Sequence, residues 1–332
     1  MGIVTIKEKS GIPKYKQIVI SIESAIVNGT LKKGDKLPSL NSIKNQHSLS
    51  RDTVLTAFNE LKTRGIVQSI VGKGYYVLSE DIDVNQKIFL LFDEFNSFKE
   101  DLYKSFTTCM GENVQVNIFF HHFNLDVFNK LINDNAGGYS YYVIMPANLK
   151  GTETVINRLP DGKVYILDQI HSELIDYPSI YQNFKKDIYK GLQAGLKQIK
   201  KYQKIILLYN EERQPKGILD GFNLFCAHNG IQNKIIDTLN DRELFKGELY
   251  IVLDDKNLIR IIKRIKDEHL TLAKDIGIIS YNDTLLKEIV EGGITTISTD
   301  FTKMGENLAA IIINKKKVRI ENPTNLIIRN SL

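Results

Sequence analysis

The chain has 332 residues, 42% of them hydrophobic and 25% charged, which is enough for two or three domains with cores of their own. This composition argues against wholesale disorder, the longest apolar runs are too short to cross a bilayer, and two distant cysteines suggest no disulfide framework. We find no export signal at the N-terminus and therefore expect a cytoplasmic protein without a membrane partner.

The net charge of +5 is unevenly distributed along the chain. Residues 1–80 hold 12 lysines and arginines against 6 acidic residues, whereas the rest of the chain holds 32 basic and 33 acidic residues. A basic N-terminal region on a nearly neutral remainder indicates a polyanionic partner for that region. A solvated lysine-rich surface is the alternative explanation for the charge alone.

Three helices are predicted in the first eighty residues. Apolar positions between Tyr15 and Ile26 repeat with a period of 3.6 residues. Ser39 can cap a second, short helix, and Ser50 can cap a third helix that ends at Arg64. Two helices separated by a tight turn, the second of them longer and capped, predict a helix-turn-helix.

A small basic hairpin is predicted directly after the third helix. Apolar runs at 66–71 and 75–78 flank Gly72-Lys73-Gly74, whose glycines permit the positive φ of a tight turn and leave Lys73 at the tip. Helix and hairpin together predict a winged helix, with the helix in a major groove of DNA and the wing along the backbone. Arg51 and Thr53 lie in the first turn of that helix, outside its buried stripe, where they can reach bases or phosphates.

Residues 13–77 resemble the DNA-binding domain of GntR-type bacterial transcriptional regulators. The segments "GTLKKGDKLPS", "LSRDTV" and "GIVQSIVGKGYYV" keep the order and spacing of that family. Asn41 and Leu55 stand where the family often has basic residues, so the operator need not follow the usual consensus. For Arg51 and Lys73 the alternative is an ordinary surface charge. The DNA-binding residues that the pattern and the resemblance imply are Lys14, Tyr15, Ser39, Asn41, Ser50, Arg51, Thr53, Lys73, Gly74 and Tyr75.

Beyond residue 86 the pattern changes to alternating strands and helices. Buried strands are predicted at 88–92, 114–120, 141–145, 164–167, 205–209, 250–253, 276–281 and 295–298. Helices are predicted at 187–202, 215–229, 257–268 and 301–315. Repeated units of this kind predict parallel sheets covered on both faces. We therefore expect a winged-helix DNA-binding domain at 1–79, a linker at 80–86, and an effector-binding and dimerisation domain at 87–332.

Polar residues follow several of these strands, at the sheet edge where open α/β sheets bind ligands. Their carboxylates and amides suit a ligand rich in hydroxyl groups, because each oxygen can accept a hydrogen bond. For any one of them, capping of the next helix is the alternative role. The candidate effector-binding residues are Asp93, Glu94, Asn148, Asp168, Gln169, Lys216, Asp255, Asn282 and Asp283.

Residues 87–332 resemble the sugar-sensing core of LacI-type repressors and the periplasmic sugar-binding proteins, notably in "VYILD", "KIILLYN", "GILDGFNLFCAHNGI" and "AKDIGIISYND". The resemblance implies a two-lobed periplasmic-binding-protein-like domain in which Asp168 and Asn282 hold a sugar. The ligand-binding arginine of that family would fall at Ile218 and is absent; Arg213 or Lys216 could substitute. A GntR-type reader joined to such a sensor is the architecture of the arabinose repressor group.

The sequence therefore predicts a DNA-binding transcriptional regulator, acting as a repressor, whose effector is a small sugar or sugar derivative. A homodimer on an inverted-repeat operator is expected, because a single small winged helix rarely supplies enough specific affinity. The alternative is a cytoplasmic sugar-binding sensor with no direct role in transcription. The six histidines lack metal-binding spacing, and no P-loop or GxSxG motif occurs, so we expect no enzyme, no metal and no cofactor.

Overall fold

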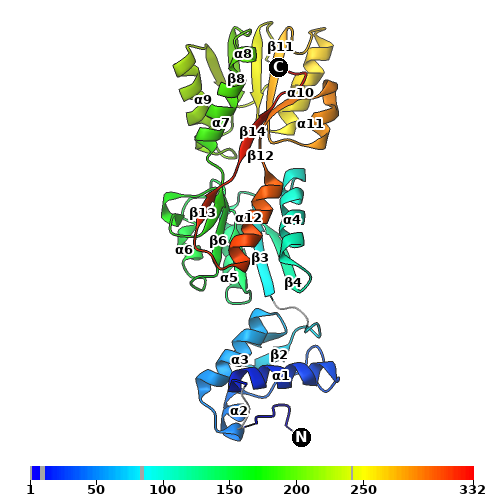
Figure 1. Ribbon diagram of the computed structural model, residues 1–332, viewed down its shortest axis with the longest axis vertical. Coiled ribbons are helices and arrows are strands. Elements are labelled where there is room, and N and C mark those ends of the chain that lie inside the picture. The colour runs from blue at the N-terminus through cyan, green and yellow to red at the C-terminus, as the bar shows by residue number, and fades with distance from the viewer. Residues whose placement is uncertain (1, 8–11, 83–85, 241) are drawn as a thin grey trace. The chain divides into compact units, whose positions relative to one another are not determined.

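The computed structural model describes residues 2–7, 12–82, 86–240 and 242–332 (Figure 1). These residues form two compact units. The first runs to Phe92 and includes 110–144 and 151–165; the second comprises 93–109, 145–150 and 166–332. Residues 83–85 of the expected linker lie outside the described residues.

The N-terminal part of the first unit is the predicted winged helix. Its elements are α1 (Lys14–Val27), α2 (Leu40–His47), α3 (Arg51–Thr63), β1 (Val67–Ile70) and β2 (Gly74–Val77). The strands pair antiparallel, and Ile18, Ile22 and Phe58 lie fully buried in a core shared by α1, α3 and the hairpin. The three helices and the hairpin expected from the sequence are confirmed.

A first six-stranded sheet has the order β13-β7-β6-β5-β3-β4. Its strands are β3 (Gln86–Phe92), β4 (Val114–Phe120), β5 (Tyr141–Ile144), β6 (Val164–Asp168), β7 (Ser179–Tyr181) and β13 (Arg319–Glu321). The helices in this part of the chain are α4 (Ser97–Met110), α5 (Leu125–Asn135) and α6 (Glu153–Ile156). The β3·β4, β3·β5, β6·β7 and β7·β13 pairs are parallel, as predicted.

The second sheet has the order β14-β12-β11-β10-β8-β9. Its strands are β8 (Lys204–Leu208), β9 (Asn233–Ile236), β10 (Glu248–Val252), β11 (Ile276–Tyr281), β12 (Thr295–Thr299) and β14 (Thr324–Ile327). The helices that accompany it are α7 (Phe184–Ala194), α8 (Leu196–Ile199), α9 (Lys216–Asn229), α10 (Asp255–Asp267) and α11 (Leu285–Ile289). The expected helix over 187–202 is divided at Gly195 into α7 and α8.

One strand of the second sheet departs from the predicted parallel arrangement. β14 pairs antiparallel with β12, with Ile297 opposite Leu326. The chain leaves β13 in the first sheet at Glu321 and enters β14 three residues later, so it returns across the second sheet in the reverse direction. Parallel neighbouring strands are joined by a crossover connection, usually a helix, as in a βαβ unit. Strand β14 is not reached through such a unit, so it need not run parallel to β12.

Within the second unit, helix α12 (Phe301–Ile313) follows a strand of the second sheet but packs on α4, beside which it runs in Figure 1. The contact is close because position 305 is glycine. A Cβ atom there would lie 2.4 Å from the carbonyl oxygen of Leu102 and 2.9 Å from the amide nitrogen of Phe106. In the described part of the chain, no helix is long and apolar enough to cross a membrane.

Candidate nucleic-acid interface and effector site

The N-terminus of α3 is built by its capping serine. The Ser50 hydroxyl oxygen accepts a hydrogen bond from the amide of Thr53 at 3.1 Å, and the two hydroxyl oxygens lie 2.8 Å apart. Capping satisfies one of the amides that a helix start leaves without an intrahelical partner. Arg51 follows directly and is exposed. The first turn therefore presents a guanidinium beside the positive end of the helix dipole, a combination that favours contact with an anion.

The helices before α3 present a second set of the predicted residues. The Ser39 hydroxyl caps α2 by accepting from the amide of Ser42 at 3.0 Å, and Asn41, the second residue of the helix, is exposed. Lys14 and Tyr15 open α1, where both are half-buried and Tyr15 packs against the core. Of these four residues, Ser39 and Asn41 are exposed.

The wing presents its lysine at a sharp turn. Gly72 and Gly74 have φ values of +73° and +107°, which glycine adopts readily, and Lys73 is exposed between them. The ring of Tyr75 instead packs edge-on against Phe58, with ring centroids 4.7 Å apart, and so anchors the wing to α3. The structure also places the ammonium of Lys36 6.0 Å from the centroid of the Tyr76 ring, a cation beside the wing that the sequence reasoning did not select.

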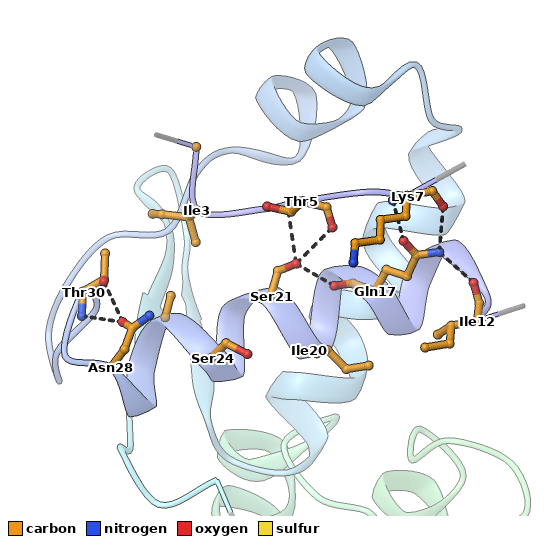
Figure 2. Close-up of a pocket in the computed structure, with 12 residues that line it drawn as sticks. Ile3, Thr5, Lys7, Ile12, Gln17, Ile20, Ser21, Ser24, Asn28 and Thr30 are labelled. Atoms are coloured by element: carbon orange, nitrogen blue, oxygen red, sulfur yellow. Dashed lines mark hydrogen bonds between the residues drawn. The ribbon is translucent and has the colours of Figure 1, made fainter. Parts of the chain in front are cut away.

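A pocket of about 530 Å³ lies between the N-terminal residues and α1 (Figure 2). Its polar groups bond to one another: Gln17 accepts from the amide of Lys7 at 2.8 Å and donates to the carbonyl of Ile12 at 2.8 Å. Ser21 in turn accepts from the amide of Thr5 at 3.1 Å. The pocket is thus formed where residues 2–7 lie along α1.

A different concentration of polar side chains lies inside the second unit. We call Asp93, Lys99, Asp168, Gln182, Asp187, Tyr281, Asn282 and Asn322 the polar cluster. Asp168 ends strand β6 with a φ of +73°, and its carboxylate accepts from the Gln182 amide at 2.5 Å. Asp93, directly after β3, forms an ion pair with the buried Lys99 of α4. Burial, followed by the charge of Asp93, raises the pKa of Asp168 to about 6.

The phenol of Tyr281 joins this group from the second sheet. Tyr281 is the last residue of β11 and is 5% exposed. Burial, then the charges of Asp187 and Asp168, raise its pKa well above the ordinary value. Asp187, in the first turn of α7, is buried as well, and burial raises its pKa to about 6 although Thr324 donates a hydrogen bond to it.

Several atoms of the polar cluster have no hydrogen-bond partner despite being buried. A buried polar atom left in this state costs about 1–3 kcal/mol, so each needs an explanation. One of these unpartnered atoms belongs to Asn282, which follows Tyr281 and has a φ of +58°. The atoms are Gln182 Oε1, Asp187 Oδ2, Tyr281 OH, Asn282 Oδ1 and Asn322 Oδ1.

Three of the predicted effector residues are engaged by other parts of the protein. Asp283 forms a two-pronged ion pair with Arg329, at 2.6 and 2.7 Å, which lowers its pKa although burial opposes the shift. The carboxylate of Asp255 pairs with Lys287 at 3.0 Å. Asn148 donates to the carbonyl oxygen of Gln214 at 2.8 Å.

The remaining candidates are placed as follows. Glu94 and Gln169 are half-buried neighbours of Asp93 and Asp168, and Lys216 is exposed at the first residue of α9. Ile218, at the position of the expected arginine, is buried in the core of the second sheet.

Sequence reasoning missed several members of the polar cluster, namely Lys99, Gln182, Asp187, Tyr281 and Asn322. Tyr281 is the last residue of a predicted buried strand, and Asp187 is the first residue of a predicted helix, where a capping role is ordinary. Lys99 lies on a helix that the sequence analysis did not predict. Their proximity depends on packing between distant segments, and a single sequence gives no direct signal of it.

A winged helix followed by a two-sheet periplasmic-binding-protein-like domain defines this chain as a helix-turn-helix regulator of bacterial type. The family model described as bacterial regulatory proteins, gntR family, matches residues 14–77, and a periplasmic binding protein-like domain model matches residues 199–332. The repressor YtrA of Bacillus subtilis is 31% identical over 99 residues, which are 30% of this chain and 72% of YtrA. The chain belongs to the gntR family of bacterial regulatory proteins.

Other relatives match over shorter shares of their length. The arabinose metabolism transcriptional repressor of Geobacillus stearothermophilus is 42% identical over 71 residues, 21% of this chain and 19% of that protein. The mannosyl-D-glycerate transport/metabolism system repressor MngR of Escherichia coli is 42% identical over 84 residues, 25% of this chain and 34% of that protein. The chain thus spans well under two thirds of either relative.

Solved structures match about three quarters of the chain. A LacI family transcriptional regulator from Silicibacter pomeroyi aligns with a TM-score of 0.63 at 13% identity, over 74% of this chain and 98% of that one. A LacI family transcriptional regulator from Enterococcus faecium with bound ribose aligns with a TM-score of 0.59 at 17% identity, over the same shares. At these identities the likeness establishes the fold, which is the one expected from the sequence.

Proposed function

We propose that the protein is a transcriptional repressor that binds operator DNA through its winged helix and changes its DNA affinity when a small hydroxylated ligand occupies the polar cluster. The observation that carries the proposal is the presence, on one chain, of a gntR-type winged helix and a LacI-like domain with unsatisfied buried polar atoms. Two relatives are named as repressors of carbohydrate metabolism, which supports a sugar or sugar derivative as the ligand.

On the DNA side, we propose that α3 enters the major groove while Lys73 contacts the phosphate backbone. The exposed Arg51 can form a bidentate pair with a guanine, and the helix dipole favours nearby phosphates. The protein would act as a homodimer on an inverted repeat, because two-fold protein symmetry matches a palindromic site. Its place of action would then be the cytoplasm, with operator DNA as partner and no catalytic step.

On the ligand side, we propose that Asp168 and Asn282 contact the effector. They lie at the carboxyl ends of strands of different sheets, so a ligand touching both would favour one arrangement of the domain over another. The unsatisfied atoms around them supply the binding energy, since each gains a partner when the ligand binds. Differential affinity for two arrangements is what couples a ligand to DNA binding.

Selection of binding sites from random DNA, followed by gel shift, tests the proposed function. We expect the full chain to enrich an inverted repeat and Arg51→Ala to enrich a repeat with a relaxed base preference at one operator position. Lys263→Ala, which removes an exposed cation from α10, is the matched control and should behave as the wild type. Enrichment of no sequence by the wild-type protein would instead favour a ligand-binding sensor that does not act on DNA.

A further inference from the structure

We propose that the polar cluster selects a hydroxylated ligand that carries a protonated amine, such as an amino sugar, and rejects phosphorylated or acidic sugars. The inference rests on the proposed function, since it concerns the ligand of the same site. It is carried by two independent properties of the described residues: the unsatisfied buried atoms are nearly all hydrogen-bond acceptors, and the buried carboxylates outnumber the cations beside them.

The acceptor excess follows from atom types. Four of the five unsatisfied atoms are carboxylate or amide oxygens; Tyr281 OH, which can donate or accept, is the fifth. The amide orientations are fixed by their partners. Gln182 must turn its NH₂ group to Asp168, and Asn322 donates to the carbonyl oxygen of Asp300 at 2.8 Å, so in both the carbonyl oxygen is left over. The missing partner is therefore a donor.

The charge excess follows from the ion pairs. Asp168 accepts a hydrogen bond from the neutral Gln182, and the cation near it, Lys99, already forms an ion pair with Asp93. Asp187 accepts from the neutral Thr324.

The cation that acts on Asp187, Lys186, is likewise committed elsewhere, since it forms an ion pair with Glu321. Among the described residues, the ion pairs of Lys99 and Lys186 are therefore made with Asp93 and Glu321, and neither Asp168 nor Asp187 has an ion pair of its own. Buried charges of one sign are costly unless an opposite charge joins them.

An ammonium group meets both requirements at once. It offers three donors and no acceptor, and its hydrogen bonds to carboxylates are about twice as strong as those between neutral groups. A neutral polyol would supply donors but leave the charge uncompensated. A phosphate or carboxylate on the ligand would add a like charge and present acceptors to acceptors, so the site should discriminate against it.

The test compares ligands that differ only in the charged group, by thermal shift and calorimetry on the full chain at pH 7. The pairs are D-glucosamine with D-glucose, D-galactosamine with D-galactose, D-mannosamine with D-mannose, and tris(hydroxymethyl)aminomethane with 1,1,1-tris(hydroxymethyl)ethane. Glucose 6-phosphate and gluconate are the anions. We expect at least one amine to bind tenfold or more tightly than its neutral partner, and neither anion to bind.

Isosteric variants assign the preference to the cluster. Asp168→Asn and Asp187→Asn remove one charge each and should reduce the amine-to-neutral ratio about tenfold, whereas Asp267→Asn, an exposed carboxylate at the end of α10, should not change it. Thermal unfolding checks that each variant is folded. Neutral sugars that bind as tightly as amines, or no amine-dependent shift across the panel, would overturn the inference. If a neutral sugar then releases operator DNA, the proposed function stands without it.

Discussion

Arg51 and Lys73 are both exposed cations of the winged helix, and we expect their contributions to DNA binding to differ in kind. Arg51→Ala should cost about 1–3 kcal/mol and relax the base preference at one operator position, because a bidentate contact to a base carries sequence information. Lys73→Ala should weaken binding to all sequences alike and reduce the salt slope by about one unit, because a phosphate contact releases counterions. Competition binding at several salt concentrations measures both. If Lys73→Ala altered the base preference and Arg51→Ala did not, the wing would contact the bases and the helix the phosphates, the reverse of what we propose.

Asp168 should make folding stability depend on pH. Its pKa is raised to about 6, above its value in an unfolded chain, so the folded state binds more protons between about pH 4 and 6. The stability that protonated Asp168 contributes is therefore present at low pH and lost as pH rises through this window. We expect Asp168→Asn to gain about 1–3 kcal/mol of unfolding free energy relative to wild type between pH 4.5 and 7.5.

Urea unfolding at these two pH values measures the difference, with Asp267→Asn as the matched control. If the Asp168 carboxylate instead titrated as an exposed one does, the difference in unfolding free energy between Asp168→Asn and the wild type would be the same at both pH values. Because burial also raises the pKa of Asp187, Asp187→Asn should show the same sign.

Helix α11 carries a buried lysine, Lys287, that stabilises the turn after β11. Lys287 is 2% exposed, and its ammonium donates to the carbonyl oxygens of Tyr281 at 2.9 Å and Asn282 at 2.8 Å. Lys287→Met should destabilise the fold by about 1–3 kcal/mol, because it leaves buried carbonyl oxygens without donors. It should also weaken effector binding, since Asn282 loses the support for its left-handed conformation.

Unfolding and ligand titration of the same variant separate the two effects, and Lys256→Met on the exposed side of α10 is the control. Wild-type ligand affinity in a measurably destabilised Lys287→Met variant would limit the role of this lysine to stability.

The elements recovered from the sequence are those whose pattern is local. Buried strands such as β11 and capped helices such as α3 have continuous apolar runs or clear stop signals. Helix α4 was missed because its segment SFKEDLYKSFTTCM buries only Lys99, Leu102 and Phe106. Strand β13 has three residues, too few for any period to emerge. Asp168 and Asn282 could be named from their position after strands, whereas Asp187 and Tyr281 join them only through tertiary packing.

For the whole molecule, we expect a homodimer. One winged helix buries too little surface on DNA for the affinity and specificity that an operator requires, and two copies would read two half-sites one helical turn apart. Sedimentation velocity at micromolar concentration should give the mass of two chains, and DNA binding should be lost in parallel with dissociation on dilution. A monomer that binds operator with unchanged affinity would contradict this expectation.

The proposed effector site is tested by titrating effector into the protein–operator complex and following the fluorescence anisotropy of the DNA. Wild-type protein, Asp168→Ala and Asn282→Ala are compared, with Asp267→Ala as the control. Loss of one buried partner of a ligand hydroxyl or amine costs about 1–3 kcal/mol, so both variants should need roughly ten- to hundredfold more ligand for the same response. Their operator affinity without ligand should equal that of the wild type. Wild-type ligand sensitivity in both variants would contradict the account and place the effector site elsewhere.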